Sequence, residues 1–154
     1  MIKGIAASSG IAIAKVFKLE HPVLDIRKQE ANAEEELKTL EQAVVKTKED
    51  IKSIQEKAVG RLSSEELAIF DAHLMVLDDP EFVGSIAETI KNDSVNAEYA
   101  TKIISDNFIG IFESMEDDYF RERAADIKDV TYRLSTHIMG KTVADLSSIA
   151  EEVV

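Results

Sequence analysis

The sequence predicts a mainly α-helical protein: a four-helix bundle-like helical subdomain, its second helix kinked, inserted in a truncated α/β subdomain. Three observations predict this fold. Apolar residues recur at helical spacing over residues 28–140, short segments near both ends have the pattern of strands, and Pro80 interrupts the second helical stretch. The expected domain boundaries are 1–20 for the first strands, 21–143 for the helical subdomain and 144–154 for the return into the α/β subdomain.

The first twenty residues predict two short strands joined by a tight turn. Residues 11–19 alternate apolar side chains with small or charged ones, and residues 6–10 (AASSG) are all small. Two paired strands are not stable in water by themselves. Because the last residues, 149–154, again have the pattern of a strand, we expect both ends of the chain to belong to one β-containing domain that the chain does not complete.

The first predicted helix covers about residues 28–58 and ends at Gly60. Its opposite face is charged, so the helix is amphipathic and packs along one side. Thr47 is the weak member of its apolar stripe. The stripe consists of Leu37, Leu40, Val44, Thr47, Ile51, Ile54 and Ala58.

The second predicted helix begins at a capping box, in which the Ser63 hydroxyl accepts from the backbone N–H of Glu66 and the Glu66 carboxylate reaches back. Pro80 kinks or restarts this helix, because proline is disfavoured inside a helix and favoured at its first position. Asp79 can cap the restarted segment. The apolar stripe before the kink consists of Leu67, Phe70, Leu74 and Leu77.

Two more helices complete the predicted bundle. The third covers about residues 97–115, and the fourth follows the acidic cluster 116–118, which favours a helix N-terminus, and continues to Gly140. The fourth helix carries cations among acids, and we expect ion pairs between residues four apart, with one cation left for a partner. The cations are Arg121, Arg123 and Lys128.

The composition excludes several classes of function. The chain has 154 residues, a formal charge of −12, a pI near 4.7 and no cysteine. Such acidity disfavours binding to nucleic acid or to anionic lipid. No apolar run is long enough to span a membrane and no signal peptide is evident, so we expect a cytoplasmic protein. Without cysteine there are no disulfides, thiolate nucleophiles or cysteine-bound zinc.

Familiar catalytic motifs are absent from the sequence. It has neither a Walker phosphate loop nor a His-Glu-x-x-His motif. A di-metal site in a helical bundle needs a glutamate three residues before a histidine, and His21, His73 and His137 all lack one. The loop 4–10 can present backbone N–H groups to a phosphate, although a turn between strands is the favoured interpretation. We therefore predict no catalytic residue and no metal ligand.

Residues 65–82 carry the candidate site. If the apolar stripe of the second helix faces the bundle, Ala68 and Met75 lie on its other face, with Phe82 just beyond the kink. Methionine and aromatic side chains suit docking surfaces, but they also fill gaps between helices, and periodicity alone does not decide between the two. His73 is more simply a partly buried, hydrogen-bonded histidine than an acid or base.

Four segments together resemble the N-terminal part of the Enzyme I family, the phosphoenolpyruvate-protein phosphotransferases of the bacterial sugar phosphotransferase system. They are GIAASSGIA at 4–12, AIFDAHLM at 68–75, LDDPE at 77–81 and ERAADIKDV at 122–130. The resemblance covers the whole chain in order. It implies that the helical subdomain interrupts an α/β phosphohistidine subdomain and docks the carrier protein HPr.

The resemblance also implies a division of labour within the full-length enzyme. Enzyme I takes a phosphoryl group from phosphoenolpyruvate onto a histidine and passes it to HPr, while a C-terminal barrel binds phosphoenolpyruvate and Mg²⁺ and forms the homodimer. This chain ends before the family's Gly-Gly-x-Thr-Ser-His stretch, which supplies the phosphorylated histidine. We therefore expect the chain alone to be inactive and to hold no cofactor.

When the family's docking residues are carried over position by position, the resemblance implies an HPr-docking surface on this chain. Phe82 and Val76 occupy positions of that surface where aliphatic contacts are usual. The surface consists of Glu65, Ala68, His73, Met75, Val76, Glu81, Phe82 and Arg123. Two alternatives remain open. One is a helical adaptor that oligomerises through the stripe of residues 37–54; the other is the N-terminal part of a related swivelling enzyme, such as pyruvate phosphate dikinase or phosphoenolpyruvate synthase.

Overall fold

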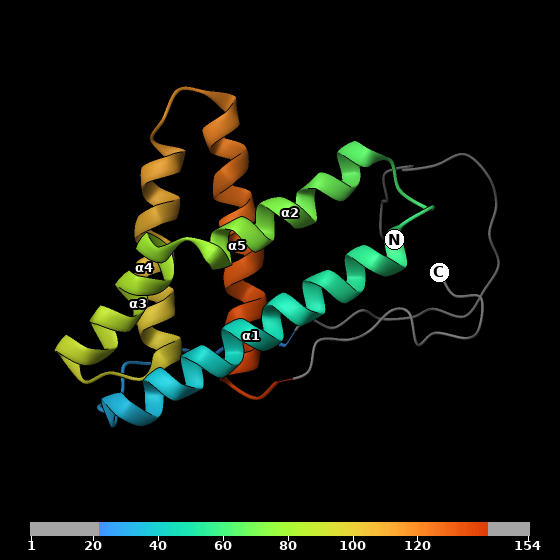
Figure 1. Ribbon diagram of the computed structural model, residues 1–154. Coiled ribbons are helices and arrows are strands. Elements are labelled where there is room, and N and C mark those ends of the chain that lie inside the picture. Colours follow the sequence, from blue (N-terminus) through green and yellow to red (C-terminus); the bar gives the residue numbers. More distant parts are fainter. Residues whose placement is uncertain (1–21, 142–154) are drawn as a thin grey trace, which may run out of the picture. The chain divides into compact units, whose positions relative to one another are not determined.

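A computed structural model of the protein describes residues 22–141, which form five helices (Figure 1). Contacts between residues place these helices in one unit, Pro22–Thr142. Within the described residues the only β-type pairing is in isolated bridges, so the mainly α fold is confirmed. The helices are α1 (Ala33–Ala58), α2 (Ser64–Asp78), α3 (Pro80–Asp93), α4 (Ala97–Glu113) and α5 (Asp118–Ile138).

Part of the expected architecture lies outside the described residues. This applies to the strands predicted in 1–20, to the loop 4–10 and to the return at 144–154. The predicted domain boundaries therefore stay a prediction.

The helices pack as two neighbouring pairs with α3 beside them. Helices α1 and α2 run side by side, α4 and α5 form a hairpin, and both members of the first pair cross α5 (Figure 1). Helix α3 packs on α4 and α1. Ten aliphatic and aromatic side chains of the helical core are less than a tenth exposed: Leu40, Val44, Ile51, Leu77, Phe82, Ile86, Ile90, Ile127, Val130 and Leu134.

Helix α1 begins later than the predicted residue 28. Asn32 ends the preceding extended segment, because its side-chain oxygen accepts hydrogen bonds from the N–H groups of Glu34 (2.9 Å) and Glu35 (3.2 Å). That segment is held by buried Asn96, whose side-chain oxygen accepts from the Gln29 N–H at 2.8 Å. A contact made far along the chain therefore sets where the helix starts.

Thr47, the weak member of the predicted α1 stripe, is fully buried. Its hydroxyl donates to the Ala43 carbonyl at 2.7 Å, which satisfies the polar atom inside the core. The stripe is thus continuous despite its one hydroxyl.

The predicted capping box and the predicted restart at Pro80 are both confirmed. The Ser63 N–H donates to the Glu66 carboxylate at 2.8 Å, and the Glu66 N–H donates to the Ser63 hydroxyl at 3.3 Å. Asp79 closes α2 and caps α3, since its carboxylate accepts from the Glu81 N–H at 2.9 Å while Pro80 occupies the first helical position. The predicted kinked helix is therefore two separate helices.

The ion pairs expected between residues four apart on the last helix are wrong. Arg121 and Arg123 each pair with an aspartate three residues away, and Lys128 pairs with Glu113 of α4. None of these three cations is without an acidic neighbour.

The expectation that Phe82 lies outside the core is also wrong. Its side chain is 1% exposed, and its ring meets the edge of Phe108 with centroids 5.4 Å apart and an interplanar angle of 82°. Because α3 restarts at Pro80, Phe82 does not continue the outer face of α2 but turns into the bundle. Phe82 is therefore a core residue.

The capping box predicts how stability depends on pH. Hydrogen bonds from the Ser63 N–H and hydroxyl lower the pKa of Glu66 below its ordinary value of 4.5. A carboxylate whose pKa is lowered by folding stabilises the fold above its unfolded pKa, and this contribution is lost as the pH falls through the folded pKa. Glu66→Gln should therefore lower the free energy of unfolding near neutral pH, and this difference should shrink as the pH falls below 4.5. Urea unfolding across this range measures the difference, and exposed Glu56→Gln in α1 is the control.

The burial of Phe82 predicts a loss of stability on truncation. Phe82→Ala should lower the free energy of unfolding by about 3–5 kcal/mol, because it removes a large buried ring and leaves a cavity. Denaturant unfolding followed by circular dichroism measures this loss. A change below about 1 kcal/mol would contradict the core position.

Candidate docking surface

Helix α2 carries apolar side chains on both of its faces. The inner face packs on the core through the predicted stripe, of which Leu77 is the most buried member at 2% exposed. On the opposite face Ile69 is 51% exposed and Met75 is 60% exposed. We call this second set the α2 outer face; it consists of Ala68, Ile69, Ala72 and Met75, whereas Val76 is partly buried and packs against the core.

The grouping of these side chains distinguishes α2 from its neighbours. Single exposed apolar residues, such as Val45 on α1, are normal on a protein surface. A cluster bordered by polar groups is typical of an interaction site. Exposed carboxylates border the α2 outer face at both ends, from Glu65 in the first turn and Glu81 just after the helix break.

His73 lies behind the α2 outer face. It is 6% exposed, so the predicted burial is right, but its Nε2 atom makes no hydrogen bond within residues 22–141. That nitrogen instead lies 3.5 Å from the Asp126 carboxylate of α5. His73 is thus placed to connect α2 with α5 and offers little surface of its own to a partner.

Arg123 of α5 is held beside a tyrosine. Its guanidinium donates to the Tyr119 hydroxyl at 3.0 Å and lies over the Tyr119 ring at 5.2 Å from the centroid. The hydrogen bond from this guanidinium to the phenol raises the pKa of Arg123 further above its ordinary value, so the side chain is always charged. A second nitrogen lies 3.5 Å from the same Asp126 that faces His73.

The sequence interpretation missed Tyr119 and Ile69 as surface residues. Tyr119 is 55% exposed, and its position four residues before Arg123 on one helix was a usable signal. Ile69 lies on the face opposite the predicted stripe, so helical spacing alone could have found it.

The predicted site residues lie in different parts of the structure. Ala68 and Met75 belong to the α2 outer face, and Glu65 and Glu81 are exposed at its ends. Val76 is partly buried against the core, and Arg123 lies on neighbouring α5. The remaining two, His73 and Phe82, are buried.

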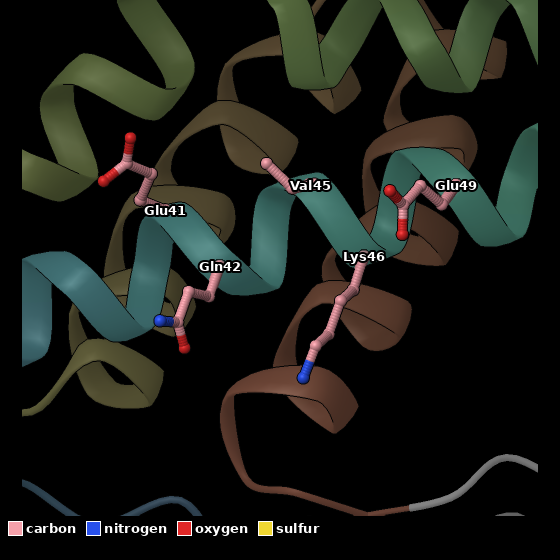
Figure 2. Close-up of a pocket in the computed structure, with 5 residues that line it drawn as sticks. All are labelled: Glu41, Gln42, Val45, Lys46 and Glu49. Carbon is pink, nitrogen blue, oxygen red and sulfur yellow. The ribbon is translucent and has the colours of Figure 1, made fainter.

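Besides the α2 outer face, residues 22–141 contain a pocket along α1 but no metal-holding cluster. A pocket of about 400 Å³ is lined by residues of α1 alone, and Figure 2 shows their side chains arranged along that one helix. No group of three or more acidic or histidine side chains in residues 22–141 could hold a metal ion. The pocket residues are Glu41, Gln42, Val45, Lys46 and Glu49.

None of the helices described by the structure is long and apolar enough to cross a membrane.

Comparison with known proteins identifies relatives along the whole chain. A family model described as PEP-utilising enzyme, N-terminal, matches residues 3–123. The phosphoenolpyruvate-protein phosphotransferases of Geobacillus stearothermophilus and Bacillus subtilis (strain 168) are 50% and 45% identical to the chain, each over 99% of it. The chain spans 27% of the length of either relative.

Solved structures support the same assignment. A solution structure of Enzyme I (nEIt) superimposes with a TM-score of 0.90 at 36% identity, covering 100% of this chain and 63% of that one. The N-terminal domain of Enzyme 1 - Nitrogen shares the fold, with a TM-score of 0.69 at 22% identity over 79% of this chain and 51% of that one. The chain therefore belongs to the family of PEP-utilising enzymes and corresponds to part of the N-terminal domain of Enzyme I.

Proposed function

We propose that this chain docks HPr for a phosphoenolpyruvate-protein phosphotransferase of bacterial sugar uptake. Docking would hold HPr while a phosphoryl group passes from an Enzyme I histidine beyond this chain to a histidine of HPr. The observation that carries the proposal is the α2 outer face, in which Ile69 and Met75 are both more than half exposed. The phosphotransfer reaction is inferred from the names of the relatives, and the docking surface is inferred from the exposed side chains of α2.

In this proposal the helical unit orients HPr and takes no direct part in the phosphoryl transfer. Phosphoryl transfer needs donor and acceptor atoms held nearly in line, and orientation supplies much of the rate enhancement. Helix α2 suits this task because α1, α3 and α5 all pack against it. A face backed by packed helices needs little ordering when a partner binds, so less binding energy is lost to entropy.

The remaining parts of the reaction belong to the full-length enzyme in this proposal. Phosphoenolpyruvate and Mg²⁺ would bind its C-terminal barrel, which would also form the homodimer. This division places HPr recognition on the chain described here and predicts that the chain alone transfers no phosphoryl group. The proposed location is the cytoplasm.

Two alternatives receive less support. An adaptor that oligomerises through residues 37–54 would need that stripe at the surface, but Leu40, Val44 and Ile51 are buried in the bundle. A different swivelling enzyme is disfavoured because the curated relatives named above are phosphoenolpyruvate-protein phosphotransferases.

The docking proposal is tested by shortening the two exposed side chains of the α2 outer face. Ile69→Ala combined with Met75→Ala should weaken HPr binding at least about tenfold, equivalent to about 1.4 kcal/mol, because apolar contact area is lost. Isothermal titration or chemical-shift titration of labelled HPr measures the affinity. The helical circular dichroism signal should not change, since both residues are more than half exposed.

The matched control is Val45→Ala combined with Val59→Ala, which shortens two side chains that are 50% and 64% exposed but lie outside α2. This variant should bind HPr as the parent does. Equal affinities for the parent and the α2 variant would rule out docking on this face.

A further inference from the structure

Asp126 lies where α5 packs on α2, next to His73. One carboxylate oxygen lies 3.5 Å from Nε2 of His73 on α2, and the other lies 3.5 Å from a guanidinium nitrogen of Arg123 on its own helix. The side chain is only 20% exposed. Asp126 is therefore a partly buried acid that contacts one group on each of the two helices.

Arg123 is the charged side chain that this arrangement holds in place. An arginine has several flexible torsions and loses rotamer entropy when it is fixed. Here Tyr119 contacts the guanidinium on one side and Asp126 on another, so much of that ordering occurs before any partner arrives. A guanidinium has five N–H donors, more than these two contacts use.

We propose that Asp126 is a positioning residue for HPr docking: it fixes the direction of the Arg123 guanidinium at the edge of the α2 outer face and, through His73, ties that direction to α2. The inference rests on the proposed function and deepens it. Its partner is a hydrogen-bond acceptor on HPr, because a guanidinium only donates. Asp126 itself touches no partner atom in this proposal and acts through Arg123.

A purely structural role for Asp126 predicts something different. If the carboxylate only held α2 against α5, its loss would lower the stability of the fold and would affect HPr binding whether or not Arg123 was present. A positioning role predicts that the effect on binding depends on Arg123. A double-mutant cycle on HPr affinity separates the two.

The cycle compares Asp126→Asn, Arg123→Ala and the two together in the full chain. Asp126→Asn alone should weaken HPr binding about fivefold, which lies within the usual range of coupling between contacting residues. In the Arg123→Ala background the same change should have less than about a twofold effect. Asp126→Glu should recover most of the lost affinity, because it restores a carboxylate within reach of Arg123.

A spectroscopic measurement reports on the arginine directly. The Nε–Hε resonance of Arg123 should shift in Asp126→Asn and return toward its parent position in Asp126→Glu. Asp106→Asn is the control, because Asp106 also pairs with a cation of its own helix, Lys102, and its substitution changes the net charge by the same amount. That control should leave both the Arg123 resonance and HPr affinity unchanged.

Two results would overturn the positioning role. One is an equal loss of affinity from Asp126→Asn with and without Arg123, and the other is parent-like binding by either single variant. Failure of the proposed function is distinguishable, because it would appear as unchanged affinity in the Ile69→Ala, Met75→Ala variant. If that variant binds weakly while the cycle shows no coupling, only the role of Asp126 is lost.

Discussion

The break between α2 and α3 is the constraint on which the rest of the structure depends. One residue, Asp79, ends the first helix and caps the second, and Pro80 fixes the point of restart. The break changes the direction of the chain between Met75 and Phe82, so that one side chain faces outward and the other enters the core. Without it, a continuous helix would place both residues on one face, because they are seven positions apart.

The same break explains where the sequence interpretation succeeded and where it failed. Helical periodicity identified the inner stripe of α2, and capping chemistry identified Ser63 and the restart at Pro80, because these signals lie within a few residues of one another. The position of Phe82 could not be predicted by extending the period of α2, since each new helix starts with its own phase. Long-range contacts were equally inaccessible; the start of α1 depends on Asn96, which only the folded chain brings near.

The candidate site shows a similar division between local and distant signals. Arg123, Tyr119 and Asp126 lie within two turns of one helix, so their proximity follows from spacing alone. The contact of Asp126 with His73 joins α5 to α2 and appears only in the folded structure. From the resemblance to Enzyme I, His73 and Arg123 were predicted as two separate docking residues. In the structure the Asp126 carboxylate lies between them and contacts both.

The α2 outer face is compatible with a stable helical bundle because its exposed side chains cost the fold little stability. Ile69 and Met75 are also exposed in the unfolded chain. Leaving them in water therefore forgoes the free energy that burial would provide but does not destabilise the fold. Stability comes instead from the other face of α2 and from the core residues of α1, α3, α4 and α5. In the docking proposal the two faces of α2 have separate tasks, so substitutions on the outer face would alter partner affinity while the inner face preserves the fold.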